Sequence, residues 1–244
     1  MKTIDKIYLI NLERSTDRLE HFMNEVKKHS IPLEKLQIFK AIDATTHEFT
    51  AEELVLCKNI SHEIKTVQCN FLSHYYCWKD SLEKGYNYTL ILQDDVYFVN
   101  DICEKIDNIV HHLPNDAEIV NLGLHYLAAC QMFIDFPIHS EYDRSFYMAE
   151  GDIINNYICK WKKGVNPASL AYIINCKNAM DIFKRFPTIK NAMDHFFNEY
   201  CISKDIMYGS TDILATGNSK FKSTIFKGET FTDLLSMYNS YLSI

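Results

Sequence analysis

The sequence of 244 residues predicts an α/β fold with one mainly parallel central sheet and helices on both of its faces. Short apolar runs alternate with segments whose apolar residues have helical spacing, and this alternation is typical of strand–helix units. Hydrophobic residues make up 47% of the chain and charged residues 23%, which is enough apolar material for a globular core. Only seven glycines and five prolines occur, so we expect no linkers and a single domain over residues 1–244.

The chain opens with a strand–helix unit. Residues 6–12 are rich in β-branched and aromatic side chains and predict a strand. A helix with Ser15 or Thr16 as its N-cap candidate follows, because the next apolar residues have helical spacing: Leu19, Phe22, Met23 and Val26. Three polar residues lie near the carboxyl end of the strand: Asn11, Arg14 and Arg18. The arginines suit phosphate or ribose groups, although two solvated arginines at a helix start are the alternative interpretation.

A second strand and a short helix follow. Residues 37–44 predict a strand that runs into a loop containing Asp43. Thr50 and Glu53 match the capping-box pattern, which predicts a short helix through Leu56.

A longer helix is expected to start near Gln68 and to end at Gly85. One of its faces is apolar and carries Phe71, Tyr75, Trp78 and Leu82. Ser73 and His74 would then lie in its first turns, close to a position that a diphosphate could occupy. A single histidine on a helix is, however, more often structural than catalytic.

The next strand ends in an unusual polar group. The apolar run Leu90–Leu92 is followed directly by Gln93, Asp94 and Asp95. Two carboxylates at the end of a buried strand are costly unless a cation lies beside them. Ligands of open α/β sheets bind outside the carboxyl ends of strands, and Mg²⁺ or Mn²⁺ with a diphosphate would explain both carboxylates. The alternative is a solvated acidic turn.

The second half of the chain is less regular. We expect a helix before Pro114 and strands over residues 117–122 and 171–174. Residues 123–163 have little periodicity and are a plausible wall or lid beside a site. Three further apolar stripes predict helices over 179–186, from 191 onward and over 231–242, the last packed on the core.

Asp194 is a candidate functional residue in the helix that begins near Asn191. It occupies the third position of that helix, where the helix dipole favours an acid, so a structural role is the alternative.

Composition and missing motifs exclude several classes. The net charge of -7 gives no support to nucleic-acid binding. The eight cysteines form no C-x-x-C pair, and we expect reduced, mostly buried thiols in an intracellular protein. No signal peptide or membrane-spanning run is expected. The fingerprints of dinucleotide-binding proteins, P-loop proteins and α/β-hydrolases are missing.

Five motifs in this order resemble family 25 glycosyltransferases, which include bacterial lipooligosaccharide galactosyltransferases and the collagen galactosyltransferase domain. They are Ile10–Leu12 with Arg14 and Arg18, Ala41–Asp43, Cys69–His74 with Trp78, Leu90–Val96, and Ala171–Ile174 with Asp194. The resemblance implies a GT-A fold, a UDP-sugar donor (most often UDP-galactose), a glycan or glycoconjugate acceptor, a divalent metal and inversion at the anomeric carbon. It divides the domain into a nucleotide-sugar half, about 1–122, and an acceptor half, about 123–244.

The resemblance also implies roles for the polar residues. Asp95, with Asp94, would hold Mn²⁺ or Mg²⁺. The nucleotide sugar would be bound by Asn11, Arg14, Arg18, Asp43, Ser73, His74, Gln93 and Asp94. Asp194 would be the general base, with Glu150, Asp152 and His195 as rivals. A cytoplasmic enzyme is expected, with peripheral membrane contact possible.

One residue departs from the family pattern. Where the family usually carries a glutamate, this chain has Gln93, which brings no negative charge. This motivates an alternative function, a catalytically silent member that binds a nucleotide sugar or a partner. A phosphatase of the haloacid dehalogenase type is a further alternative, although Gln93–Asp95 fits its Asp-x-Asp pattern poorly.

Overall fold

The computed structural model of the chain describes residues 1–58, 60, 64–123, 151–161, 169–180, 184, 193–197, 207–212, 214–217 and 221. The helices among them are α1 (Thr16–His29), α2 (Ala51–Cys57), α3 (Lys65–Glu83), α4 (Ile102–His111) and α8 (Met193–Phe196). The strands are β1 (Lys6–Asn11), β2 (Leu36–Lys40), β3 (Tyr88–Gln93), β4 (Val96–Phe98), β5 (Ile119–Asn121), β6 (Gly151–Ile153), β7 (Ile158–Trp161), β8 (Ala171–Asn175), β9 (Met207–Ser210) and β10 (Ala215–Gly217).

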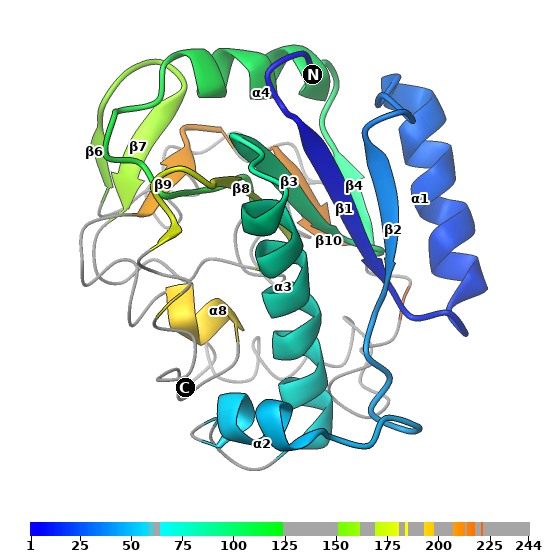
Figure 1. Ribbon diagram of the computed structural model, residues 1–244. Helices are drawn as coiled ribbons and strands as arrows, with labels where there is room; N and C mark the ends of the chain where they lie inside the picture. The colour runs from blue at the N-terminus through cyan, green and yellow to red at the C-terminus, as the bar shows by residue number, and fades with distance from the viewer. Residues whose placement is uncertain are drawn as a thin grey trace, which may run out of the picture.

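Eight of the described strands form one sheet in the order β2-β1-β3-β8-β5-β9-β7-β6. The strands β1, β2 and β3 are parallel, and β9 is parallel to β5. Strand β8 is antiparallel to both β3 and β5, and β7 is antiparallel to both β9 and β6. Six of these eight strands therefore point in one direction, and the predicted mainly parallel sheet is confirmed (Figure 1).

Each face of the sheet has its own hydrophobic core, because successive side chains of a strand point to opposite faces. On one face Tyr8 of β1 packs in a cluster with Phe71 and Trp78 of α3. On the other face the β1 residues Ile7 and Leu9 belong to a cluster that includes side chains of α1 and α4. Helices thus cover both faces, as the sequence predicts.

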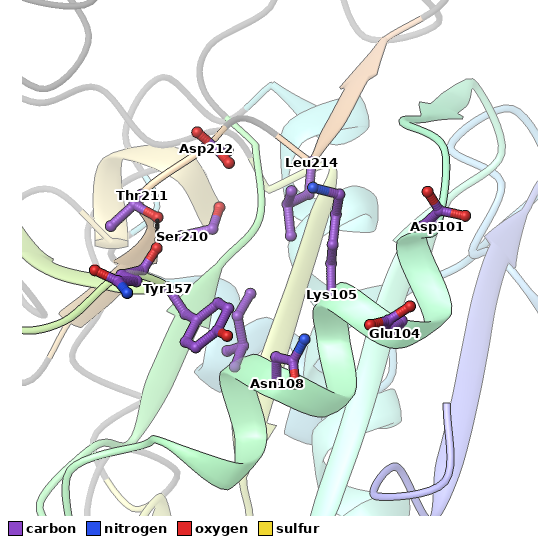
Figure 2. Close-up of a pocket in the computed structure, with 11 residues that line it drawn as sticks. Asp101, Glu104, Lys105, Asn108, Tyr157, Ser210, Thr211, Asp212 and Leu214 are labelled. Atoms are coloured by element: carbon purple, nitrogen blue, oxygen red, sulfur yellow. Dashed lines mark hydrogen bonds between the residues drawn. The ribbon is translucent and has the colours of Figure 1, made fainter.

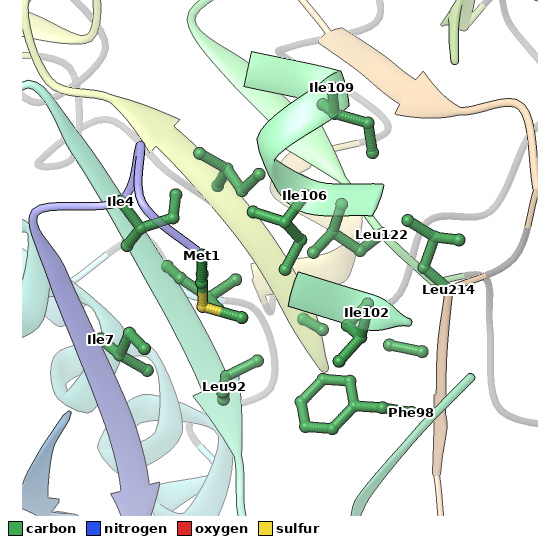
Figure 3. Packing of buried hydrophobic residues seen from close by; sticks show 14 of the residues in the cluster. Met1, Ile4, Ile7, Leu92, Phe98, Ile102, Ile106, Ile109, Leu122 and Leu214 are labelled. Carbon is green, nitrogen blue, oxygen red and sulfur yellow. The ribbon is translucent and has the colours of Figure 1, made fainter. Parts of the chain in front are cut away.

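The second cluster shows how strongly α4 is held (Figure 3). Ile102, Ile106 and Ile109 of this helix are at most 2% exposed and lie over the strands of the sheet. Burial of such a side chain contributes roughly 1.5–3 kcal/mol.

Several predicted details are confirmed. Thr50 and Glu53 make both hydrogen bonds of the capping box, and Gly85 has a φ of 68° just after α3. Ser15 is the N-cap residue of α1, although its side chain makes no capping hydrogen bond. The six cysteines within the described residues are free, and five of them are buried. Among the described helices, none is both long and apolar enough to cross a lipid bilayer.

The start of α3 was predicted wrongly. The helix begins at Lys65, one turn before the expected start near Gln68, because Val67 and Cys69 extend its buried face. The sequence has no capping signal there, since the N-cap residue is an isoleucine without a capping hydrogen bond. Ser73 and His74 consequently lie in the middle of α3, buried, and not in its first turns.

Five strands of the described chain were not predicted, namely β4, β6, β7, β9 and β10. They have three or four residues each, so they contain too little sequence for a periodic signal. Strands β6 and β7 form an antiparallel hairpin inside the stretch expected to be a wall or lid, while residues 124–150 of that stretch lie outside the described residues. Most of the helix expected over 179–186, and all of the helix expected over 231–242, also lie outside them. Of the helix expected from 191 onward, residues 193–196 form α8.

A small second sheet joins the acidic turn to a distant segment. Strand β4, which starts directly after Asp95, pairs with β10 in antiparallel fashion. The carbonyl of Leu122 accepts hydrogen bonds from the amides of Leu214 and Ala215. Gly123 lies so close to this segment that a Cβ at residue 123 would be 2.5 Å from the carbonyl oxygen of Ala215.

Gly123→Ala is therefore expected to push β10 away and to lower the free energy of unfolding by about 1–3 kcal/mol. Gly85→Ala is the matched control: its φ of 68° disfavours alanine by about 1 kcal/mol, but a Cβ there meets no atom within 4 Å. Urea unfolding and hydrogen exchange of the β4 and β10 amides measure the two effects. Unchanged exchange in Gly123→Ala would contradict the close approach.

Candidate functional site

The candidate site lies where three neighbouring parallel strands end. Strands β2, β1 and β3 are adjacent and finish at Lys40, Asn11 and Gln93. The loops that follow these strands therefore meet at one edge of the sheet. Each of the nine predicted ligand-binding residues makes a polar contact at this edge, within the loops or with α1 and α3. They are Asn11, Arg14, Arg18, Asp43, Ser73, His74, Gln93, Asp94 and Asp95.

The centre of this edge is a buried cluster of one guanidinium and two carboxylates. Arg18 Nη1 lies 3.0 Å from Asp94 Oδ1 and 3.3 Å from Asp95 Oδ2. Asn11 Nδ2 donates to the other oxygen, Asp94 Oδ2, at 2.8 Å. Both oxygens of Asp94 thus have protein partners, and this carboxylate is fixed in place.

Arg18 is held on several sides. It lies in the first turn of α1, where the predicted strand–helix unit directs it toward the end of β3. Its guanidinium lies 5.1 Å from the ring centroid of Phe221, a cation–π distance. Burial lowers the pKa of Arg18, but the adjacent Asp95 and Asp94 outweigh this effect and raise it. Arg18 is therefore a permanent cation at this position.

Asp95 differs from Asp94, because one of its carboxylate oxygens has no hydrogen-bond partner in the described part of the chain. Its Oδ1 atom is buried and has no hydrogen-bond partner among the described residues. Burial raises the pKa of Asp95 to about 6; Arg18 opposes this shift and Asp94 adds to it. A buried carboxylate oxygen without a partner is expensive, so Oδ1 is the atom of this cluster best suited to accept a cation or a donor.

The cluster can supply one oxygen to a divalent metal without rearrangement. Asp95 Oδ1 is such an oxygen, whereas Asp94 would have to give up Arg18 or Asn11. No group of three or more potential metal-binding side chains occurs among the described residues. Mg²⁺ and Mn²⁺ suit a site of this kind, because one or two carboxylates with substrate phosphates and waters complete their coordination.

Arg14 and Asp43 form a second, more exposed pair. The ion pair joins the loops after β1 and β2, with the Arg14 side chain 48% exposed. Ser73 supports the same loop, because its hydroxyl accepts a hydrogen bond from the amide of Ile42 at 2.9 Å. Ser73 thus has a structural role in this structure, while Arg14 is open to solvent.

Gln93 and His74 form a third group beside the acidic turn. Gln93 Nε2 lies 3.3 Å from His74 Nε2 and 3.0 Å from Ser169 Oγ. His74 Nδ1 lies 2.8 Å from the hydroxyl of Tyr172, which accepts from Trp78 Nε1 at 2.8 Å. His74 is fully buried, and burial lowers its pKa to about 3, so the ring is neutral.

Of the predicted base and its three rivals, the structure describes the side chain of Asp152 alone. Asp194 and His195 lie within α8, but both side chains lie outside the described part of the chain. Glu150 also lies outside it, and Asp152 is exposed on β6. The role of Asp194 stays a prediction.

A separate pocket of about 260 Å³ lies between α4 and the segment after β9 (Figure 2). Glu104 and Lys105 line it from the helix, and Tyr157, Thr211 and Asp212 line it from the opposite side. None of the predicted site residues contributes to this pocket. We therefore place the candidate site at the acidic turn.

Sequence reasoning missed two side chains beside these groups, His21 of α1 and Tyr172 of β8. His21 donates from Nε2 to the carbonyl of Val96 at 3.1 Å, and its ring packs edge-on against Tyr97 and Phe221. The helical spacing of His21 from Arg18, one turn earlier, is the only signal that could have indicated it. Tyr172 lies in the Ala171–Ile174 motif, but as a strand residue it gave no signal of a polar role.

The Arg18 cluster predicts a large difference between two arginines. Arg18→Gln removes the only described cation beside Asp94 and Asp95, so we expect a loss of about 3–5 kcal/mol in the free energy of unfolding. Arg14→Gln breaks an exposed pair and should cost at most about 1 kcal/mol. Urea unfolding of both variants is the measurement, and equal losses would contradict the central role of Arg18.

Asp95→Asn is expected to change the pH dependence of stability. The folded pKa of about 6 exceeds the ordinary value of 3.8, so ionised Asp95 destabilises the fold above pH 6. This cost disappears as the pH falls through 6 toward 4, and the variant never has it. We compare the free energy of unfolding of Asp95→Asn with that of the wild type. This difference should favour the variant by about 3 kcal/mol more at pH 8 than at pH 4, because each pKa unit corresponds to about 1.4 kcal/mol.

Asp107→Asn is the control of opposite sign. The amides of Lys2 and Thr3 and the hydroxyl of Thr3 donate to Asp107. These bonds hold the pKa of Asp107 well below its usual range, although burial opposes them. The wild type should lose this stabilisation as the pH falls below 4, and Asp107→Asn should lack it at every pH. Parallel pH profiles for the two variants would contradict the assignment for Asp95.

Comparison with known proteins identifies the family. The family model described as "Glycosyltransferase family 25 (LPS biosynthesis protein)" matches residues 4–197. Human procollagen galactosyltransferase 2 is 24% identical over 132 residues, which are 49% of this chain and 20% of that protein. Procollagen galactosyltransferase 1 of Danio rerio is 21% identical over 192 residues, which are 76% of this chain and 29% of that protein.

The chain thus spans less than a third of the length of these two relatives. Among solved structures, a glycosyltransferase involved in the glycosylation of the major capsid of PBCV-1 has a TM-score of 0.46 at 10% identity, over 96% of this chain and 98% of that chain. The family match covers most of the chain and includes every predicted site residue. This chain belongs to glycosyltransferase family 25.

Proposed function

We propose that this chain is an inverting glycosyltransferase that moves a hexose from a UDP-sugar to a hydroxyl of a saccharide or glycoconjugate. The observation that carries the proposal is the buried Asp94–Asp95 turn with one unpartnered oxygen at the carboxyl end of β3. Galactose is the proposed sugar, because two relatives are named as galactosyltransferases.

The donor would lie across the ends of β2, β1 and β3. Arg14 is the exposed cation at this edge and would exchange Asp43 for a phosphate oxygen of the donor. Asp43 would then be free to accept a hydroxyl of the nucleoside. Arg18 stays between the two carboxylates and limits the negative charge that faces the diphosphate.

The divalent cation is assigned to Asp95 through its free Oδ1. Mn²⁺ or Mg²⁺ bound there would supply charge neutralisation for the leaving diphosphate. Asn11 and Arg18 keep Asp94 in place beside it, so that the turn does not have to reorganise during the reaction.

The transfer itself would be a single displacement. The acceptor oxygen forms a bond to the anomeric carbon while the bond from that carbon to the diphosphate oxygen breaks, and UDP leaves with the electron pair. Asp194 is proposed to take the proton of the acceptor hydroxyl, with Glu150, Asp152 and His195 as rivals. A positioned base of this kind contributes typically ~10²- to 10⁴-fold.

A second candidate is a silent family member that binds a nucleotide sugar without turnover. Two observations favour it: Arg18 already pairs with both carboxylates, and position 93 is a neutral amide. The phosphatase alternative loses its support with the family assignment, and both oxygens of Asp94 are already occupied by protein groups.

The test is UDP release from a panel of UDP-sugars with Mn²⁺, Mg²⁺ or EDTA. We expect slow hydrolysis of one donor, UDP-galactose, which stops with EDTA. Asp95→Asn should reduce the rate by at least about 100-fold and abolish stabilisation by Mn²⁺ in thermal unfolding. Binding of UDP without release from any donor would favour the silent member, and full activity of Asp95→Asn would refute the metal assignment.

A further inference from the structure

A buried chain of hydrogen bonds leads from the core of α3 to the acidic turn. It runs from Trp78 through the hydroxyl of Tyr172 to His74, and from His74 to Gln93. Trp78, His74 and Tyr172 are fully buried, whereas Gln93, the residue before Asp94, is only partly buried. This series of hydrogen bonds therefore ends at the Gln93 amide, beside the candidate site.

The donors and acceptors of this chain can be assigned by elimination. The carbonyl oxygen of Ser169 lies 3.4 Å from the amide end of Gln93, and a carbonyl can only accept. The amide atom that faces Ser169 and His74 must therefore be the NH₂ group. It can donate to His74 Nε2 only if that nitrogen carries no hydrogen, so the hydrogen of the neutral ring lies on Nδ1.

The other hydrogen bonds of this series agree with the assignment. The hydrogen on His74 Nδ1 points to the oxygen of Tyr172, which also accepts from the indole of Trp78. Both hydrogens of the Gln93 amide are then used, one toward His74 and one toward Ser169. Its carbonyl oxygen Oε1 has no hydrogen-bond partner among the described residues.

We propose that Trp78, Tyr172 and His74 are positioning residues that fix the amide of Gln93, so that its Oε1 accepts a hydroxyl of the bound nucleotide sugar. This inference rests on the proposed function for the ligand, but the arrangement of the amide is independent of it. The ligand class is a polyhydroxylated anion, and the hydroxyl belongs either to the ribose or to the transferred sugar.

The proposal explains why a neutral residue suits position 93 in this chain. A carboxylate in the same place would face the carbonyl of Ser169 and the lone pair of His74 Nε2, which are both acceptors. Gln93→Glu would have to move the ring hydrogen to Nε2 or to protonate a fully buried imidazole. We therefore expect Gln93→Glu to weaken ligand binding and not to improve it.

The first arm of the test is ¹⁵N NMR of the full chain labelled at histidine, with His74→Gln to assign the signal among ten histidines. We expect the hydrogen of His74 on Nδ1 in the wild type. It should shift toward Nε2 in Tyr172→Phe, which removes the acceptor, and in Gln93→Glu. A wild-type ring with the hydrogen on Nε2 would overturn the proposal.

The second arm compares the affinities of UDP and UDP-galactose by titration calorimetry. Loss of one hydrogen bond predicts about 3- to 10-fold weaker binding in Gln93→Ala. If both ligands lose the same affinity, the hydroxyl bound by Oε1 belongs to the ribose. If only UDP-galactose loses affinity, the hydroxyl belongs to the galactose. Tyr172→Phe should reproduce part of the loss. Gln37→Glu, on the edge strand β2, is the matched charge control and should bind like the wild type.

The two arms separate the proposals. If the wild type binds neither ligand, the proposed function fails and the role of Oε1 fails with it. The position of the His74 hydrogen still tests whether the amide of Gln93 is held in the assigned orientation. If both ligands bind and Gln93→Ala binds them equally well, the acceptor role of Gln93 is refuted and the proposed function is unaffected.

Discussion

The site depends on the pairing of Arg18 with Asp94 and Asp95. Two adjacent carboxylates at the end of a buried strand would repel each other, and Arg18 is the group that allows them to stay there. Arg18 can do this because β1 and β3 are neighbours and α1 follows β1 after a short loop. The pairing therefore also fixes the start of α1 against the end of β3. In this chain the same contact stabilises the fold and sets the charge of the site.

The surrounding architecture restricts the acidic turn from both sides. Strand β3 brings the turn to the edge of the main sheet, and β4 leads away from it into a second sheet with β10. Phe221, a few residues after β10, lies over the guanidinium of Arg18. Phe221, the last described residue, thus packs on a cluster built from the first hundred residues of the chain. Substitution of Phe221 consequently changes the environment of Arg18.

Much of the first half of the fold could be predicted from sequence, because its strands and helices are long enough to show a period. The polar residues after β1, β2 and β3 lie together in the structure because parallel neighbouring strands end at one edge, whereas their roles in a site stay predictions. The start of α3 and the strands β9 and β10 could not be predicted, since a three-residue strand has no period and gains its stability from distant partners. The link from His74 to Tyr172 is of this kind, as the two residues are 98 positions apart.

The charges at the edge of the sheet indicate what kind of ligand it can accept. Asp94 and Asp95 contribute two negative charges when both are ionised, and Arg18 contributes one positive charge. Arg14 and Asp43 cancel, His74 is neutral, and Gln93 adds nothing. An excess of one negative charge would repel a diphosphate, so binding requires either a divalent cation at Asp95 or the release of Arg14 from Asp43. A glutamate at position 93 would raise the net charge of the site from −1 to −2. With a neutral Gln93, the cation has less negative charge to neutralise when an anionic donor binds.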